Sequence, residues 1–302
     1  MERFDIHIHT NNDCNLACKH CYNNSGARTV VRIDLESLYR YLMLFSKNYI
    51  CDIHLEGGEL FLYPEVFEVL DQLDESVLKS ITITTNGTVF MKDSRVLNVL
   101  RKIGALRISI EGHTQSIHEK VRNSSLEEIL SNAGIYQNQG ANVVIRVTLN
   151  KYNEQTLFRE GIRFLADKGF KKIQVYEFQA VGRGQAHDLK IKSCFQEIFN
   201  RFVAIKEPVW IQMMLAERWI PEVSKFNWEN KGVTVKYSSE RNGLAIKANG
   251  NVTICPWDEE SIIANFSKMT DSEILSFLSA NCFVHNCLFC SKVTLQKVNY
   301  EI

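Results

Sequence analysis

The sequence predicts an α/β fold: a partial barrel of six β/α units followed by a smaller α+β unit. Two observations carry this prediction. Strand-like runs rich in Ile, Val and Thr alternate with amphipathic, helix-like runs through the first two-thirds of the chain. After residue 206 this rhythm stops, and a hairpin signal and a cluster of cysteines follow. We therefore expect a barrel domain over residues 1–206 and a second domain over residues 207–302.

The expected strands come in chain order, each followed by a helix-like stripe. The strands are expected at 4–9, 51–56, 80–85, 105–110, 142–149 and 172–178, and the helices at 34–49, 64–75, 92–103, 124–139, 153–169 and 192–206. Units in series form a parallel sheet with right-handed crossovers, and six are too few to close an eight-stranded barrel. In such folds the chemistry collects at the carboxyl ends of the strands.

Composition excludes several classes of protein. Lys plus Arg and Asp plus Glu are equal at 35 each, so the charge gives no case for nucleic acid or an anionic membrane. The N-terminus has no apolar stretch of signal-peptide length, and no window has the length of a membrane span. Nine cysteines without an export signal indicate a reducing, cytoplasmic compartment, and metal or redox chemistry rather than disulfides.

Three of these cysteines, Cys14, Cys18 and Cys21, follow the first expected strand. Three thiolates on one tight loop can hold three corners of a cubane iron–sulfur cluster, which leaves the fourth iron open to a substrate or cofactor. The alternatives are a disulfide and a zinc knuckle with His20 as the fourth ligand. His20 lies directly before Cys21, where reaching the same metal would be strained. The spacing favours the cluster over zinc without deciding between them.

Glycine-bearing polar turns end the next three expected strands. The first is Glu56-Gly57-Gly58-Glu59, whose glycines let the backbone approach a ligand closely. The others are Thr84-Thr85-Asn86-Gly87 and Ser109-Ile110-Glu111-Gly112, with Arg122 eleven residues beyond Glu111. A carboxylate there could hold a ribose diol, and an arginine could hold a carboxylate. Each turn by itself reads as an ordinary β-turn. Together with the cysteines they indicate one shared site.

With these motifs, residues 4–206 resemble the radical S-adenosylmethionine (radical SAM) enzymes, whose C-x3-C-x2-C signature follows a first strand. The resemblance implies a TIM-like partial barrel in which Cys14, Cys18 and Cys21 ligate a [4Fe-4S] cluster, and S-adenosylmethionine (SAM) chelates the open iron. It gives the SAM amino group to Gly57, Gly58 and Glu59, and the ribose and carboxylate to Ser109, Glu111 and Arg122. Asn86 matches the asparagine of the family's TNG turn, and Arg183 belongs to a Gly-Arg-Gly turn near the adenosyl group. His20 stands where the family often has Tyr or Phe.

The last third resembles the auxiliary-cluster extensions called SPASM and the shorter twitch form. Asn249-Gly250 predicts a two-residue hairpin turn, and Gly250-x4-Cys255 and Cys287-x2-Cys290 match elements of those extensions. No cysteine lies in residues 235–241 or after Cys290, which favours one auxiliary cluster over two. Cys255, Cys282, Cys287 and Cys290 supply enough thiolates for one [4Fe-4S] cluster or, alternatively, one zinc ion. Cys51 and Cys194 are expected in the core, with a hydrogen-donating thiol as the alternative for Cys194.

The resemblance implies an oxidoreductase that cleaves SAM reductively to a 5′-deoxyadenosyl radical, which abstracts a hydrogen atom from the substrate. It favours a ribosomally made peptide (RiPP maturation), with epimerisation, crosslinking or thioether formation as the outcome. The expected partners are that peptide, a separate leader-binding protein, and an electron donor such as flavodoxin or ferredoxin. The alternatives are a small-molecule dehydrogenase or cyclase of the short twitch type, which the short stretch ahead of Cys14 supports, and a zinc-stabilised, non-enzymatic binding protein.

Overall fold

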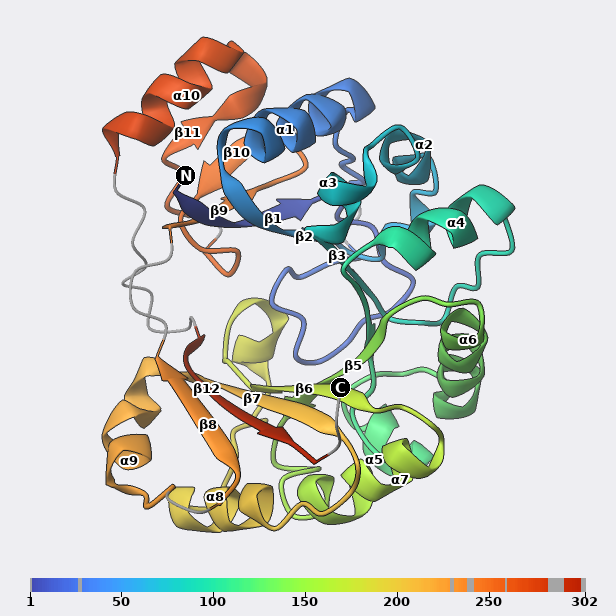
Figure 1. Cartoon of the computed structure of the whole chain (residues 1–302), viewed down its shortest axis with the longest axis vertical. Helices are drawn as coiled ribbons and strands as arrows, with labels where there is room; N and C mark the ends of the chain where they lie inside the picture. Colours follow the sequence, from blue (N-terminus) through green and yellow to red (C-terminus); the bar gives the residue numbers. More distant parts are fainter. Residues whose placement is uncertain are drawn as a thin grey trace.

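The computed structural model describes residues 2–26, 29–228, 231–237, 242–258, 260–281 and 291–299, and these residues form one twelve-stranded sheet with helices around its outside (Figure 1). The strand order is β11-β10-β9-β1-β2-β3-β4-β5-β6-β7-β12-β8. The strands are β1 (Arg3–His9), β2 (Ile50–Glu56), β3 (Ile81–Thr85), β4 (Ala105–Ser109), β5 (Val143–Leu149), β6 (Lys172–Glu177), β7 (Trp210–Ala216), β8 (Val233–Tyr237), β9 (Asn242–Ile246), β10 (Asn251–Thr253), β11 (Ala264–Asn265) and β12 (Ser291–Val298).

The six expected strands are β1 to β6, and each pairs in parallel with the next, which confirms the partial barrel. The parallel run continues by one strand beyond residue 206, because β7 pairs in parallel with β6. Its sequence, Trp-Ile-Gln-Met-Met-Leu-Ala, lacks the Ile, Val and Thr enrichment that marks the other strands. The sequence pattern therefore predicted six parallel strands and missed the seventh. The division of the chain at residue 206 stays a prediction.

The helices cover the outer face of the sheet (Figure 1). They are α1 (Leu35–Asn48), α2 (Val66–Leu70), α3 (Glu75–Lys79), α4 (Ser94–Lys102), α5 (Gln115–Glu119), α6 (Leu126–Asn138), α7 (Ile162–Asp167), α8 (Phe195–Val203), α9 (Ile220–Lys225) and α10 (Asp271–Ala280). Asp34 caps α1, since its side chain accepts a hydrogen bond from the backbone N–H of Ser37. The helix expected over 64–75 is shorter in the structure, since α2 ends at Leu70, a turn follows, and α3 begins only at Glu75. The one expected over 153–169 is a π-helical turn, Leu157–Gly161, followed by α7.

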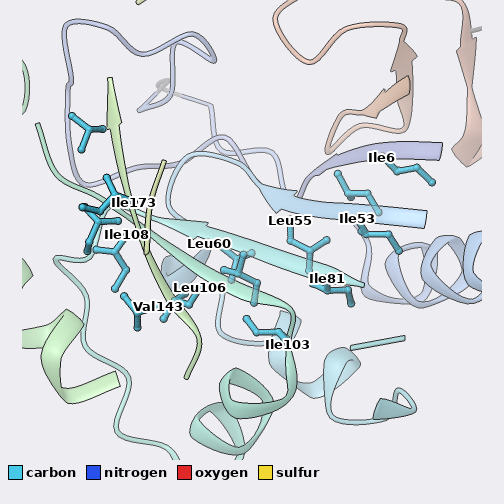
Figure 2. Close-up of a cluster of buried hydrophobic side chains, with 14 of the residues drawn as sticks. Ile6, Ile53, Leu55, Leu60, Ile81, Ile103, Leu106, Ile108, Val143 and Ile173 are labelled. Carbon is cyan, nitrogen blue, oxygen red and sulfur yellow. The ribbon is translucent and has the colours of Figure 1, made fainter. Parts of the chain in front are cut away.

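The two faces of the sheet differ in chemistry. Rows of paired residues such as Ile6, Ile53 and Ile81 point outward and are fully buried under the helices (Figure 2). The alternate row points into the barrel and is polar, with His7 beside His54. Parallel strands covered on both faces are normally apolar throughout. The alternation therefore marks a barrel interior built for polar contacts, which we call the lumen.

The C-terminal segments complete both ends of this sheet. β9 pairs in parallel with β1, whereas β12 pairs antiparallel with β7 and carries β8 on its other side. The expected hairpin joins β9 to β10, but its loop is longer than two residues. The N–H of Gly250 bonds to the carbonyl of Lys247, and Gly250 takes a φ of +80° beyond that turn. Among the described residues, none of the helices has the length and apolarity to cross a membrane.

Candidate active site

The predicted cluster loop follows β1 and carries the three cysteines to the carboxyl end of the barrel. Cys18 is buried, and Cys14 and Cys21 are partly exposed. Each sulfur faces an N–H donor: Leu16 N lies 3.4 Å from Cys14 Sγ, Ser25 N lies 3.4 Å from Cys21 Sγ, and an Arg122 nitrogen lies 3.5 Å from Cys18 Sγ. Donors of this kind stabilise thiolate ligands.

A cavity of about 110 Å³ joins these cysteines to the turns at the following strand ends. Of the residues predicted to bind SAM, it is lined by Gly57, Gly58, Asn86, Ser109 and Arg122. The site that the sequence predicted from separate turns is thus assembled as one cavity. Glu59 and Glu111 lie behind its wall, and Arg183 lies against the loop that carries the cysteines.

The cysteine loop fits a cubane cluster better than a single metal ion. Thiolates that share one tetrahedral zinc lie about 3.8 Å apart, given Zn–S bonds of about 2.3 Å. Within the described part of the chain, one group of potential ligands has all its ligand atoms within 4.8 Å of one another, and it is not the cysteine trio. At least two of the three sulfurs therefore lie more than 4.8 Å apart, which suits ligands to different corners of a cluster. Burial raises the pKa of Cys14 to about 11, so cluster binding must release its proton.

The two glycines after β2 fit against the cluster loop itself. A Cβ on Gly58 would lie 1.8 Å from the carbonyl oxygen of Asp13, and a Cβ on Gly57 would lie 2.6 Å from that of Asn11. Gly58 N donates to Asn11 O at 2.9 Å, and Glu59 N donates to Asp13 O at 2.8 Å. Glycine is required here because the end of β2 and the cluster loop meet backbone to backbone.

Glu59 is fully buried and accepts three hydrogen bonds. Its carboxylate binds Thr85 Oγ1 at 2.6 Å, Asn86 N at 2.7 Å and Phe61 N at 3.1 Å. Burial outweighs these bonds and raises the pKa of Glu59. These bonds occupy three of about four acceptor positions on the carboxylate, so Glu59 fixes the turn from behind the cavity wall. Asn86 is fixed in turn, since its Nδ2 donates to Asn15 Oδ1 at 2.9 Å.

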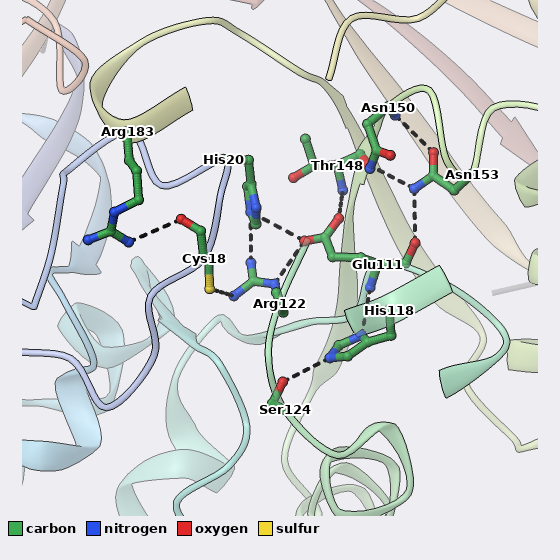
Figure 3. Close-up of polar contacts among 10 residues, drawn as sticks. All are labelled: Cys18, His20, Glu111, His118, Arg122, Ser124, Thr148, Asn150, Asn153 and Arg183. Atoms are coloured by element: carbon green, nitrogen blue, oxygen red, sulfur yellow. Dashed lines mark hydrogen bonds and ion pairs between the residues drawn. The ribbon is translucent and has the colours of Figure 1, made fainter. Parts of the chain in front are cut away.

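Arg122 and Glu111 form a buried ion pair on the other side of the cavity (Figure 3). Arg122 Nε lies 2.9 Å from Glu111 Oε1, and its Nη2 lies 3.1 Å from Nε2 of His20. Because a guanidinium only donates, the Nε2 of His20 must accept, and His20 is neutral. Burial and the charge of Arg122 lower the pKa of His20 well below its ordinary value. His20 therefore acts as a hydrogen-bond acceptor for Arg122.

His118 fixes Glu111 from behind, a role that the sequence did not indicate (Figure 3). Its Nδ1 accepts from the backbone N–H of Glu111 at 3.2 Å, and its Nε2 lies 2.9 Å from Ser124 Oγ. Burial and the charge of Arg122 lower the pKa of His118 to about 4. A buried histidine seven residues after a strand-end carboxylate is a weak signal, because sequence spacing does not show which backbone group it reaches.

Arg183, in the turn after β6, holds the cluster loop through hydrogen bonds to its carbonyl groups. Its Nη1 donates to Cys18 O at 3.1 Å, its Nη2 donates to Ser25 O at 2.5 Å, and its backbone N–H donates to Cys21 O at 2.9 Å. The preceding Gly182 has a φ of +55°, and a Cβ there would lie 2.1 Å from the carbonyl oxygen of Tyr22. This turn is therefore built to seat the cluster loop.

A second cavity, of about 870 Å³, fills the lumen below the cluster loop. Glu56 and Arg146 line both cavities and so mark where the lumen meets the cluster site. Tyr22, next to Cys21, donates a hydrogen bond to Glu56. Burial opposes the charge of Glu56, but His7 and Arg146 lower its pKa well below the ordinary value. The sequence did not indicate the role of Arg146, because only strand register brings it beside Glu56.

Asp5, His7 and His54 in the lumen are the closely spaced group, but their hydrogen bonds do not suit a metal ion. Arg107 donates to Nδ1 of His54 at 3.0 Å, so Nε2 carries the proton and donates to Asp5 Oδ1 at 2.8 Å. To bind a metal ion, His54 would need a free lone pair on one ring nitrogen, but Nδ1 accepts from Arg107 and Nε2 carries the proton. Burial opposes the charge of His7, yet Glu56 and Asp5 raise its pKa. The group is therefore a hydrogen-bonded cluster around the Asp5 carboxylate and not a metal site.

Cys255 is buried on the loop after β10, and this loop reaches over the lumen. Trp257 lines the lumen cavity and packs edge-on against Tyr22, with ring centroids 6.4 Å apart. Cys282, Cys287 and Cys290 lie outside the described residues, so the predicted auxiliary ligand set stays a prediction. Cys51 is in the core as expected. The core prediction for Cys194 is wrong, since this residue is exposed at the N-cap of α8.

Comparisons with known proteins agree with this geometry. The family model of the radical SAM superfamily matches residues 8–159. The subtilosin biosynthesis protein AlbA of Bacillus subtilis is 24% identical over 179 residues, which cover 57% of this chain and 39% of AlbA. The molybdenum cofactor biosynthesis protein 1 of Bos taurus is 24% identical over 267 residues, which cover 80% of this chain and 40% of the relative.

The chain thus spans about two-fifths of the length of either relative. Among solved structures, SuiB of Streptococcus suis bound to its precursor peptide SuiA superimposes with a TM-score of 0.70 at 14% identity. That match covers 95% of this chain and 66% of SuiB, and it shows a shared fold. On the family match, which spans half of the sequence and includes the cysteine loop, this chain is an enzyme of the radical SAM superfamily, whose members use a [4Fe-4S] cluster and SAM.

Proposed function

We propose that this enzyme modifies a peptide substrate bound in the lumen. The observation that carries the proposal is the continuity of the two cavities, since the 870 Å³ lumen meets the cluster site at Glu56 and Arg146. This volume is near the upper end of small-molecule pockets, which span about 300–1,000 Å³, and leaves room for several amino-acid residues. AlbA is named for bacteriocin biosynthesis, and SuiB was solved with a precursor peptide, which supports a peptide.

The residues around the cluster cavity receive separate roles in this proposal. Cys14, Cys18 and Cys21 hold the cluster, and when bound, the cluster and SAM supply a 5′-deoxyadenosyl radical that removes a hydrogen atom from the substrate. The carbonyls of Gly57 and Gly58 receive the SAM ammonium group, and Glu59 holds their turn from behind. Arg122 and Ser109 form the polar wall at the ribose and carboxylate of SAM, and Glu111 orients Arg122. Asn86 orients the turn, and Arg183 fixes the cluster loop.

The second domain, residues 207–302, is proposed to bind one auxiliary [4Fe-4S] cluster through Cys255, Cys282, Cys287 and Cys290. The position of Cys255 supports this, because its loop carries Trp257 over the lumen, next to the substrate. A cluster there would accept the electron released when the substrate radical is oxidised. Iron and acid-labile sulfide should then reach about eight of each per chain, the content of two cubanes. A zinc ion at this site would leave about four iron and one zinc.

The test uses anaerobically reconstituted enzyme with SAM, a one-electron reductant such as reduced flavodoxin, and short peptides encoded beside the gene. We expect one of these peptides to change. A loss of two hydrogens would indicate a crosslink or thioether, and uptake of one deuterium from D₂O would indicate epimerisation. Gln212→Ala, in the lumen, should lower peptide modification more than 5′-deoxyadenosine formation, whereas Gln196→Ala, at an exposed position of α8, should lower neither. Equal effects of the two variants would contradict a lumen substrate site.

A small-molecule substrate is the second candidate, and one observation favours it. The similarity to the molybdenum cofactor protein runs over 80% of this chain, more than the 57% matched by AlbA but less than the 95% matched, at 22% identity, by the sporulation killing factor maturation protein SkfB of Bacillus subtilis. The same assay separates the candidates if purine nucleoside triphosphates are added in place of the peptides. SAM cleavage stimulated by a nucleotide and by none of the peptides would replace the peptide proposal with this one.

A further inference from the structure

Arg122 is placed to act on the cluster as well as on SAM. Each of its three guanidinium nitrogens has its own partner: Nε meets Glu111, Nη2 meets His20, and Nη1 lies 3.5 Å from the sulfur of Cys18 (Figure 3). The side chain is 11% exposed, so water screens these contacts little. A cation and its N–H therefore point at one thiolate of the predicted cluster.

The orientation of this guanidinium is fixed by a second layer of contacts. Glu111 Oε2 accepts from Thr148 N at 3.0 Å, Glu111 O accepts from Asn153 Nδ2 at 3.0 Å, and His118 holds its backbone N–H. The carboxylate is thus held against β5, so its position does not change if Arg122 moves. His20, on the cluster loop, closes the arrangement from the opposite side. Arg122 has one geometry in which all its partners are satisfied, and that geometry includes Cys18.

Hydrogen bonds and positive charge at a cluster sulfur favour the reduced state, because reduction adds a negative charge to the cluster. We propose that Arg122 is a positioning residue for the cluster, raising its reduction potential through the N–H···S contact with Cys18. Glu111 acts in the opposite direction, since its negative charge neutralises part of the arginine. Arg122 contacts the sulfur itself at 3.5 Å, whereas Glu111 bonds to Arg122, so the effect of the arginine is the larger one. The inference depends on the three-cysteine cluster and not on the identity of the substrate.

The test is a redox titration of the reconstituted enzyme without SAM and without substrate, followed by electron paramagnetic resonance of the reduced cluster. Cys255→Ala is used as the background in every sample, so that the signal comes from the barrel cluster. We expect Arg122→Gln to lower the ratio of reduced to oxidised cluster at a fixed potential by about tenfold, which is about 59 mV for a one-electron couple. Arg122→Lys keeps the positive charge but loses the planar set of guanidinium N–H donors, and it should shift the ratio less. Glu111→Gln should raise it.

Arg159→Gln is the matched control, because it removes the same charge from a side chain that is 77% exposed and pairs with Glu160. It should shift the ratio by less than about threefold. The proposal is overturned if Arg122→Gln stays within that same margin, or if Arg122→Gln and Glu111→Gln move the potential in the same direction, as mere loosening of the loop would do. Should Arg122→Gln not assemble a cluster, the opposite signs expected for Arg122→Lys and Glu111→Gln decide the question. None of these results depends on a peptide, so they stand or fall separately from the proposed function.

Discussion

Replacing Gly58 by alanine should displace the cluster loop. The new Cβ would lie 1.8 Å from the carbonyl oxygen of Asp13, and reaching the 3.0 Å below which real Cβ contacts essentially never fall requires 3.0 − 1.8 = 1.2 Å of movement. Both partners are backbone, so no side chain can turn aside. Two backbone hydrogen bonds, from Gly58 to Asn11 and from Glu59 to Asp13, are broken by such a shift. They contribute about 1 kcal/mol each, and the overpacking costs a further ~1–3 kcal/mol.

The free energy of unfolding should thus fall by about 3–5 kcal/mol, which corresponds to about 5–8 °C in the unfolding midpoint of a chain of this length. Anaerobic calorimetry measures this, and iron analysis of the same sample should show loss of about four iron per chain. Gly134→Ala is the control, because a Cβ at that position in α6 meets nothing within 4 Å. It should stabilise the protein by about 0.5–1 kcal/mol. A Gly58→Ala protein with wild-type iron content and midpoint would refute the backbone contact.

Further predictions concern the cysteines and His118. Replacing Cys14, Cys18 and Cys21 together with alanine should abolish 5′-deoxyadenosine formation and leave about four iron per chain, and undiminished SAM cleavage would contradict their role. Cys255→Ala should keep SAM cleavage and lose product formation; normal product from a folded variant without the second cluster would exclude an electron relay. His118 has a pKa of about 4 when folded and near 6.5 when unfolded, so the unfolded state binds more protons between these values. Stability should therefore fall as the pH drops through this window, by about 2 kcal/mol at pH 5, and urea titrations should show a smaller fall in His118→Asn.

The sequence predicted the strands well because strand composition is a local property. All of β1 to β6 lie within a residue or two of their expected ranges, whereas β7 was missed because its Met and Gln residues carry no strand signal. The strand-end turns could be grouped into one site, since parallel strands bring their carboxyl ends together.

The contacts inside the site could not be predicted, because they depend on register and on side-chain direction. Arg146 reaches Glu56 from three strands away, and His118 reaches the backbone of Glu111, neither of which sequence spacing encodes. The two glycines after β2 were recognised as a close approach, but the chain that approaches them is the cluster loop. The sequence therefore predicted that Gly57 and Gly58 allow a close approach, but it did not show that they contact the backbone of Asn11 and Asp13.

The pairing of β9 with β1 has a consequence for biosynthesis. During translation the first strand emerges early, but the strand that covers its outer edge begins only at Asn242. At about 5–20 residues per second, more than 200 residues must follow before that edge is closed, which takes some ten seconds or more. In this interval β1 presents a free edge able to pair with another chain. The cluster loop attached to it stays next to an unfinished sheet, so cluster insertion should follow release of the C-terminal third from the ribosome.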